Sequence, residues 1–213
     1  MQIELDKPVV LALAVFAAAL VPGTAAAADM PEAAKTCADC HGENGVSTNK
    51  DHPTIAGASA FFLENELVIY REKARPCVPE LFKEAEKKPP EKDHCALAQS
   101  LSEDEVTALA DYFSSQDFVP ADQSVDQGLA DKGESIHAAS CDRCHTDGGS
   151  LALDDAGILA GQWKPYLLRQ LKHFKAGERW QPEKMAPEMK DLSDQDMKAL
   201  VEYYASQGPE RFQ

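Results

Sequence analysis

The sequence predicts an all-α protein built from two tandem halves of similar design. Three observations support this fold class. A CxxCH motif occurs twice, as CADCH at residues 37–41 and as CDRCH at residues 141–145. Each half ends in a segment with apolar residues at i, i+3, i+4 and i+7, which is typical of an amphipathic helix. No segment alternates apolar and polar residues at the period of two that a half-buried strand requires, so no sheet is expected.

Residues 1–28 are expected to form a signal peptide. The apolar run PVVLALAVFAAALV has about the length of a signal-peptide core, and AAAAD supplies the small residues at which a signal peptidase cleaves. Cleavage after Ala28 would leave a mature chain in the bacterial periplasm with no stable membrane span. An uncleaved anchor is the alternative, because Glu4 and Asp6 precede the apolar run where export signals usually carry positive charge.

The mature chain is strongly acidic. Without residues 1–28 it has 34 acidic and 20 basic side chains, which gives a net charge of −14. Such a surface repels the phosphates of nucleic acids and of anionic lipids, so neither is expected as a partner. It is suited to docking on a basic surface of another protein.

The CxxCH motif is the attachment signature of c-type haem. Its two thiols bond to the vinyl groups of the porphyrin, and the adjoining histidine becomes the proximal ligand of the iron. The sequence therefore predicts two covalently bound haem c groups. The expected attachment residues are Cys37, Cys40 and His41 for haem 1, and Cys141, Cys144 and His145 for haem 2.

The two halves share a register that is interrupted once. Fourteen residues separate His41 from Ile55, and fourteen separate His145 from Leu159. The first half then carries thirteen extra residues before its LS pair, in an inserted loop at about 71–95. We expect a first domain at 29–116, a polar linker at 117–127 and a second domain at 128–213. Each domain should contain a helix, a haem-binding loop, a middle helix (59–73 or 164–178), a ligand loop and a terminal helix.

The terminal helices have a clear start signal. The segments LSEDEVTALADYFSSQ and LSDQDMKALVEYYASQ share seven of sixteen residues. In each, a serine is followed three residues later by an acid, as Ser102 with Glu105 and Ser193 with Asp196. This pattern is typical of a helix N-terminus.

Taken together, these motifs resemble the diheme class I cytochromes of the cytochrome c4 type. The second half is similar to the cytochrome subunit of flavocytochrome c sulfide dehydrogenase, through the runs ILAGQWKPYL and EKMAPEM. The resemblance implies two class I cytochrome c domains, each wrapped around one haem. It also implies a partner subunit that carries FAD and oxidises sulfide, and a soluble c-type cytochrome or another acceptor that receives the electrons.

In such cytochromes the second axial ligand is usually a methionine before the terminal helix. Met185 matches that position in the second half, with Met189 as a nearby competitor. The first half has no methionine between Cys37 and Leu101, and His94 lies seven residues before Leu101, as Met185 lies seven before Leu192. We expect the metal ligands His41 and His94 for haem 1. For haem 2 we expect His145 and Met185.

Two alternatives for haem 1 remain open. His52 is a second candidate for the sixth ligand, although its position beside Pro53 places it on the proximal side. Cys77 and Cys95 flank the inserted loop and are expected to form a disulfide, because the compartment is oxidising. A resemblance to thiosulfate dehydrogenases, in which a cysteine-ligated haem is catalytic, keeps a thiolate ligand open as well.

The sequence contains no nucleophile and base pair and no flavin fingerprint. It therefore indicates an electron-transfer chain rather than an enzyme that acts alone. Three functions are consistent with this: the haem subunit of a flavin-dependent sulfide dehydrogenase, a free diheme electron carrier, and an enzyme that oxidises a sulfur compound at haem 1.

Overall fold

The computed structural model describes residues 30–83 and 93–212 of the 213-residue chain. Within these ranges it contains helices and turns and no strand, which confirms the predicted all-α class. The expected signal peptide and the middle of the inserted loop, residues 84–92, lie outside the described residues. Among the described residues, no helix combines the length and apolarity needed to cross a membrane.

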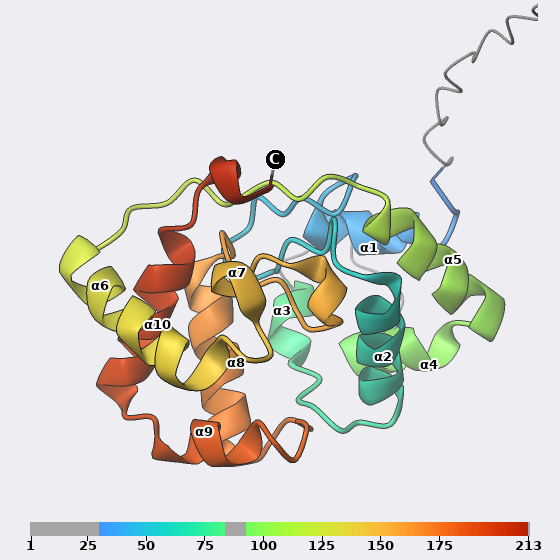
Figure 1. Cartoon of the computed structure of the whole chain (residues 1–213). Helices are drawn as coiled ribbons and strands as arrows, with labels where there is room; N and C mark the ends of the chain where they lie inside the picture. Colours follow the sequence, from blue (N-terminus) through green and yellow to red (C-terminus); the bar gives the residue numbers. More distant parts are fainter. Residues whose placement is uncertain (1–29, 84–92, 213) are drawn as a thin grey trace, which may run out of the picture.

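The two halves lie side by side (Figure 1). The described part of the first half contains five helices, α1 Ala34–His41, α2 Ala60–Arg71, α3 Pro79–Lys83, α4 His94–Ser100 and α5 Glu103–Ser114. The main helices of the second half are α6 Gln127–Ile136, α8 Lys164–Ala176, α9 Ala186–Asp191 and α10 Asp194–Ala205, with the short, irregular α7 Thr146–Gly149 between α6 and α8. A π-helical turn, His137–Cys141, continues α6 into the second CxxCH motif, and 3₁₀ turns occupy Ala152–Asp154 and Pro209–Phe212.

Both terminal helices begin where the sequence predicts. The Ser102 side chain accepts a hydrogen bond from the Glu105 backbone N–H, and the Glu105 carboxylate accepts one from the Ser102 N–H. Ser193 and Asp196 form the same reciprocal pair at the start of α10. Each pair satisfies two backbone donors that a helix N-terminus otherwise leaves without an intrahelical partner.

Three predicted loops are wrong in detail, because each is partly helical. The first CxxCH motif occupies the last part of α1, and His94 is the first residue of α4. Helix α4 forms because the Asp93 side chain accepts a hydrogen bond from the Ala96 N–H at 2.9 Å, ahead of a run rich in alanine and leucine. The expected ligand loop of the second half likewise ends in the short helix α9.

The linker is packed rather than free. Residues 117–126 run without helix to α6, which starts after its N-cap residue Asp126. The Ala121 N–H donates to the Gly161 carbonyl at 2.7 Å, and the Phe118 ring stacks on that of Phe212 with centroids 4.5 Å apart. The linker therefore lies against the second half before it enters α6.

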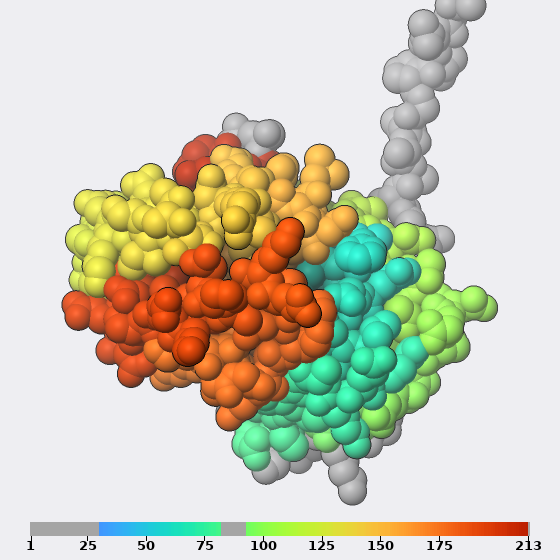
Figure 2. All heavy atoms as spheres, turned by 60° about the horizontal axis from the view of Figure 1, so that its bottom comes forward, coloured from blue at the N-terminus to red at the C-terminus, as the bar shows by residue number. Residues whose placement is uncertain are grey.

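The boundary between the halves is continuous and polar. Figure 2 shows the second half, in orange and red, packed directly against the cyan and green first half. The buried side-chain amide of Gln162 bonds both backbone groups of Thr54, accepting from N–H at 3.0 Å and donating to C=O at 2.6 Å. The Trp163 indole N–H donates to the Ser47 carbonyl at 2.9 Å. Such paired buried polar groups fix the orientation of one half relative to the other.

Replacing Gly133 by alanine is expected to destabilise the haem-loaded protein by about 1–3 kcal/mol, the usual cost of overpacking. Gly133 lies where α6 packs against α10, and a Cβ there would lie 2.1 Å from the Ala199 carbonyl oxygen. Denaturant unfolding followed by circular dichroism measures the change. Gly128→Ala in the same helix is the control, because its new Cβ would meet only Asp126 Oδ1, at 3.5 Å. Equal losses in the two variants would contradict the packing argument.

Candidate haem centres

A large cavity lies inside the first half. It holds about 1300 Å³ of empty space, part of which is open to solvent. Cys37, Cys40 and His41 line it from α1, and His52 and His94 line it from two other segments. Much of the remaining wall is apolar and includes Leu63, Leu67, Leu97, Leu109 and Phe113. A flat apolar macrocycle with polar edges fits such a lining.

The proximal side is built by α1. Cys37, Cys40 and His41 are spaced at i, i+3 and i+4, so their side chains leave the helix on one face. His41 Nδ1 lies 2.8 Å from the Pro53 carbonyl oxygen and donates to it, which leaves Nε2 as the metal-binding nitrogen. Burial lowers the pKa of His41 to about 4, so the ring is neutral at neutral pH, as a metal ligand must be.

His94 faces His41 at a distance that suits two ligands of one iron. Their ring centroids are 6.3 Å apart and the rings are inclined by 82°. A metal–imidazole bond is about 2.0–2.1 Å long and the nitrogen lies about 1.1 Å from the ring centroid, so two imidazoles on opposite sides of a metal have centroids roughly 6 Å apart. Burial, with the nearby His41 and Arg75, lowers the pKa of His94 to about 3, which keeps this ring neutral too.

His52 is also close to His41, with ring centroids 6.1 Å apart. It directly precedes Pro53, whose carbonyl binds the Nδ1 edge of His41. That edge faces away from the nitrogen available to a metal. The geometry therefore favours His94 over His52 as the distal ligand.

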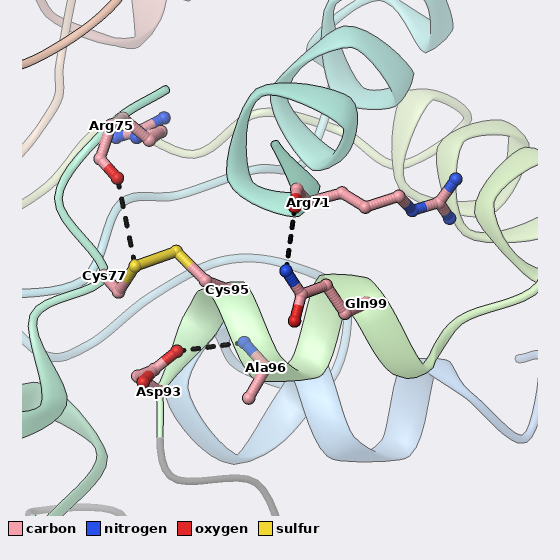
Figure 3. The surroundings of a disulfide bond; sticks show 7 residues. All are labelled: Arg71, Arg75, Cys77, Asp93, Cys95, Ala96 and Gln99. Carbon is pink, nitrogen blue, oxygen red and sulfur yellow. Dashed lines mark hydrogen bonds between the residues drawn. A yellow bond between two sulfur atoms is a disulfide. The ribbon is translucent and has the colours of Figure 1, made fainter. Parts of the chain in front are cut away.

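Cys77 and Cys95 are joined by a disulfide across a sequence separation of 18 residues. Figure 3 shows the bond at the start of α4, beside the Asp93 cap. Gln99 adds a hydrogen bond from its amide to the Arg71 carbonyl at 2.9 Å, so α4 is also fastened to the end of α2. With both sulfurs in the bond, neither cysteine offers a thiolate to haem 1 in this structure. The disulfide instead anchors the helix that begins with His94.

In the second half, Cys141 ends the π-helical turn and His145 follows Cys144 directly. None of the four motif cysteines of the chain is in a disulfide, so their sulfurs are available for thioether bonds. Burial lowers the pKa of His145. Its Nδ1 is buried and has no hydrogen-bond partner among the described residues, and glycine, at position 157, stands where the first half has Pro53. The two proximal histidines thus differ in how they are held.

Met185 occupies the structural position of His94. It immediately precedes α9, seven residues before Leu192 at the end of that helix, as His94 lies seven before Leu101 at the end of α4. The Met185 side chain is partly buried and packs against the core of the second half. Met189 lies one helical turn later and is only 4% exposed within that core.

Sequence reasoning missed one wall of the first cavity. Four side chains of α8, which belongs to the second half, line it: Tyr166, Arg169, Gln170 and His173. The other histidine outside the candidate ligands, His137, is 3% exposed, and its Nδ1 lies 3.0 Å from the Tyr204 hydroxyl. A contribution of α8 to the first cavity depends on how the halves dock, which no local pattern in the sequence reports.

Comparisons with known proteins match each half of the chain to a cytochrome family model. The family model described as cytochrome c matches residues 31–117, and the model described as cytochrome C oxidase, cbb3-type, subunit III matches residues 128–203. Cytochrome c4 of Stutzerimonas stutzeri is 28% identical over 200 residues, covering 86% of this chain and 91% of the relative. The solved structure of reduced recombinant cytochrome c4 from Pseudomonas stutzeri superposes with a TM-score of 0.66 at 27% identity, covering 82% of this chain and 94% of that one.

The chain belongs to the cytochrome c4-like family of diheme class I cytochromes c. This diheme cytochrome carries two covalently bound haem c groups, one in each half, as the sequence predicts. It is also 28% identical over 180 residues to a protein named thiosulfate dehydrogenase electron acceptor from Thiomonas intermedia, covering 80% of this chain and 76% of the relative.

Replacing both Cys77 and Cys95 by serine is expected to lower the free energy of unfolding by about 3 kcal/mol, because the open chain gains conformational entropy in the unfolded state. Denaturant unfolding of the haem-loaded protein, without reductant, measures the loss. With both haems reduced beforehand by ascorbate, which leaves disulfides intact, adding a thiol reductant should destabilise the natural chain and leave the double variant unchanged. Equal reductant sensitivity of the two proteins would show that the bridge is not the stabilising element.

Proposed function

We propose that this diheme electron carrier works in the periplasm as the haem subunit of a flavin-dependent, sulfide-oxidising partner. Haem 1 would be held by Cys37, Cys40, His41 and His94. Haem 2 would be held by Cys141, Cys144, His145 and Met185. The single observation that carries the proposal is the 6.3 Å separation of the His41 and His94 rings, which pairs two imidazoles where the second half offers a methionine.

The two ligand sets give the chain two different redox centres. When bound, each haem supplies a one-electron iron couple, and a thioether ligand raises its reduction potential. His94 in place of methionine therefore makes the first centre the lower of the two. A low-potential centre beside a higher one suits a chain that takes electrons from a reduced flavin and passes them on, since each transfer is downhill.

The chain's own residues hold this difference in place. The Pro53 carbonyl orients His41 by accepting a hydrogen bond from its Nδ1–H, and the disulfide at Cys95 fixes the helix that carries His94. The lining around both histidines is largely apolar, and a bound haem would displace water from it, which would strengthen the electrostatic effect of nearby charges. The acidic surface is suited to a partner with a basic face.

The second candidate function is electron acceptance from a thiosulfate-oxidising enzyme. It is favoured by the likeness to the thiosulfate dehydrogenase electron acceptor of Thiomonas intermedia. Affinity purification from the native host separates the two candidates. Co-purification of an FAD-containing polypeptide, with reduction of the cytochrome by sulfide, supports the proposal. Reduction by thiosulfate together with a flavin-free partner would overturn it in favour of the second candidate.

Replacing His94 by methionine is expected to raise the lower of the two reduction potentials, because a thioether then replaces an imidazole on haem 1. Spectroelectrochemical titration measures both potentials, and magnetic circular dichroism identifies the ligands. The variant should show two methionine-type haems and the natural chain one. His52→Gln is the control and should leave both ligand signatures unchanged. A natural chain that already shows two methionine-type haems would refute the ligand assignment.

Electron exchange with the physiological partner is expected to slow as salt is added. The mature chain has a formal net charge of −14, so attraction to a basic docking face is screened when the Debye length shortens from about 10 Å at 0.1 M to about 3 Å at 1 M salt. Stopped-flow mixing at a series of ionic strengths measures the second-order rate constant. A rate constant that rises with salt would show that the docking face of the partner is acidic.

A further inference from the structure

A buried cluster of four side chains lies where the two halves meet. It consists of Glu66, Arg75, Gln170 and Arg179, and we call it the arginine cluster. Its members are related by the internal repeat. A shift of 104 residues carries Cys37 onto Cys141, and the same shift carries Glu66 onto Gln170 and Arg75 onto Arg179. The cluster thus contains one arginine and one acceptor from each half.

Each arginine of the cluster contacts both acceptors. Arg75 forms an ion pair with Glu66 and donates to Gln170 Oε1 at 2.8 Å. Arg179 donates to the same Gln170 oxygen at 2.8 Å and to Glu66 Oε1 at 2.6 Å. Both guanidinium side chains are 6% exposed and Glu66 is 15% exposed. Two buried cations therefore share one carboxylate and one amide oxygen, and loss of either acceptor leaves buried donors unsatisfied.

The cluster reaches the candidate ligand of haem 1 through one aromatic ring. Arg75 Cζ lies 4.2 Å from the centroid of the Tyr70 ring, a cation–π contact. The His94 ring also contacts Tyr70. The two rings are stacked, with centroids 3.9 Å apart and planes inclined by 25°. His94, Tyr70 and Arg75 thus form a continuous series of contacts that ends on Gln170 of the second half.

The second half repeats only part of this series. The 104-residue shift carries Tyr70 onto Phe174, and Arg179 Cζ lies 4.3 Å from the Phe174 ring. Phe174 packs against the same core as Met185. A flexible thioether has no ring that could stack on Phe174. The stacked contact is therefore specific to the half whose candidate ligand is histidine.

We propose that Tyr70 and Arg75 are positioning residues for His94, and that the second half, through Gln170, sets how firmly His94 holds the iron of haem 1. The proposal rests on the assignment of His94 as a ligand. Gln170 fixes the Arg75 guanidinium, the guanidinium fixes the Tyr70 ring, and the ring limits rotation of the imidazole. Loosening any of these contacts lets His94 leave the iron more often.

The test is the rate at which cyanide displaces the distal ligand of oxidised haem 1 in the haem-loaded chain. Gln170→Leu keeps the size of the side chain and removes the acceptor, and it should speed displacement roughly tenfold, the factor that corresponds to one charge-assisted hydrogen bond. Gln170→Glu keeps an acceptor and should leave the rate near that of the natural chain. Trp163→Phe removes a different hydrogen bond between the halves and should also leave it unchanged.

Tyr70 supplies a second, independent pair of variants. Tyr70→Leu removes the stacked ring and should speed displacement, whereas Tyr70→Phe keeps the ring and should rescue the natural rate. If Gln170→Leu fails to fold with two haems, the comparison of Tyr70→Leu with Tyr70→Phe tests the proposal on its own. Equal rates in Tyr70→Leu and Tyr70→Phe, or equal rates in Gln170→Leu and Trp163→Phe, would overturn the proposal.

Electron paramagnetic resonance of the natural chain separates this inference from the ligand assignment on which it rests. A signal without a bis-histidine haem would overturn the assignment itself. A bis-histidine signal with unchanged displacement rates in Gln170→Leu and Tyr70→Leu would overturn only the role of the contact series.

Discussion

The structure depends on the filling of an apolar space that the polypeptide leaves open. In the first half the buried apolar cluster consists of Ala34, Leu109, Tyr112 and Phe113, and a large cavity lies beside it, bordered by α1, α2 and α4. A chain segment of this size buries too little apolar surface to offset the entropy lost on folding. A covalently attached porphyrin supplies the missing contacts, and its attachment through the α1 motif makes them permanent. The two CxxCH motifs are therefore elements of the core as well as of the redox centres.

The two halves are not independent domains joined by a linker, because the second half helps to enclose the cavity of the first. Helix α8 belongs to the second half by sequence, yet it walls the first cavity with Tyr166, Arg169, Gln170 and His173. The residues just before α8 continue the contact, since Gln162 binds the backbone next to Pro53, whose carbonyl holds His41. The surroundings of haem 1 are thus shared between the halves.

The features that the sequence could predict are those encoded over short stretches. The CxxCH motifs and the capped terminal helices follow from spacing within about a dozen residues. The match of His94 with Met185 rests on the same kind of spacing and stays a prediction. Helix α4 was missed although its signal is equally local, because Asp93 was treated as part of a polar loop and not as a cap. The arginine cluster was out of reach for a different reason. Its two contacts between the halves, Arg75 with Gln170 and Arg179 with Glu66, join side chains 95 and 113 residues apart. Single charged residues usually face solvent, so nothing local in the sequence indicates that these are buried.

The disulfide between Cys77 and Cys95 has a consequence for how the protein is made. The chain has six cysteines, of which four must react with the porphyrin as thiols while the other two form a disulfide with each other. Closely spaced CxxC thiols are themselves prone to oxidation. During biogenesis, four of the six sulfurs must therefore form thioether bonds and two must form a disulfide. Cys77 and Cys95 are only 18 residues apart in sequence and meet at the start of α4. Their closeness along the chain favours their pairing with each other over pairing with a CxxCH cysteine.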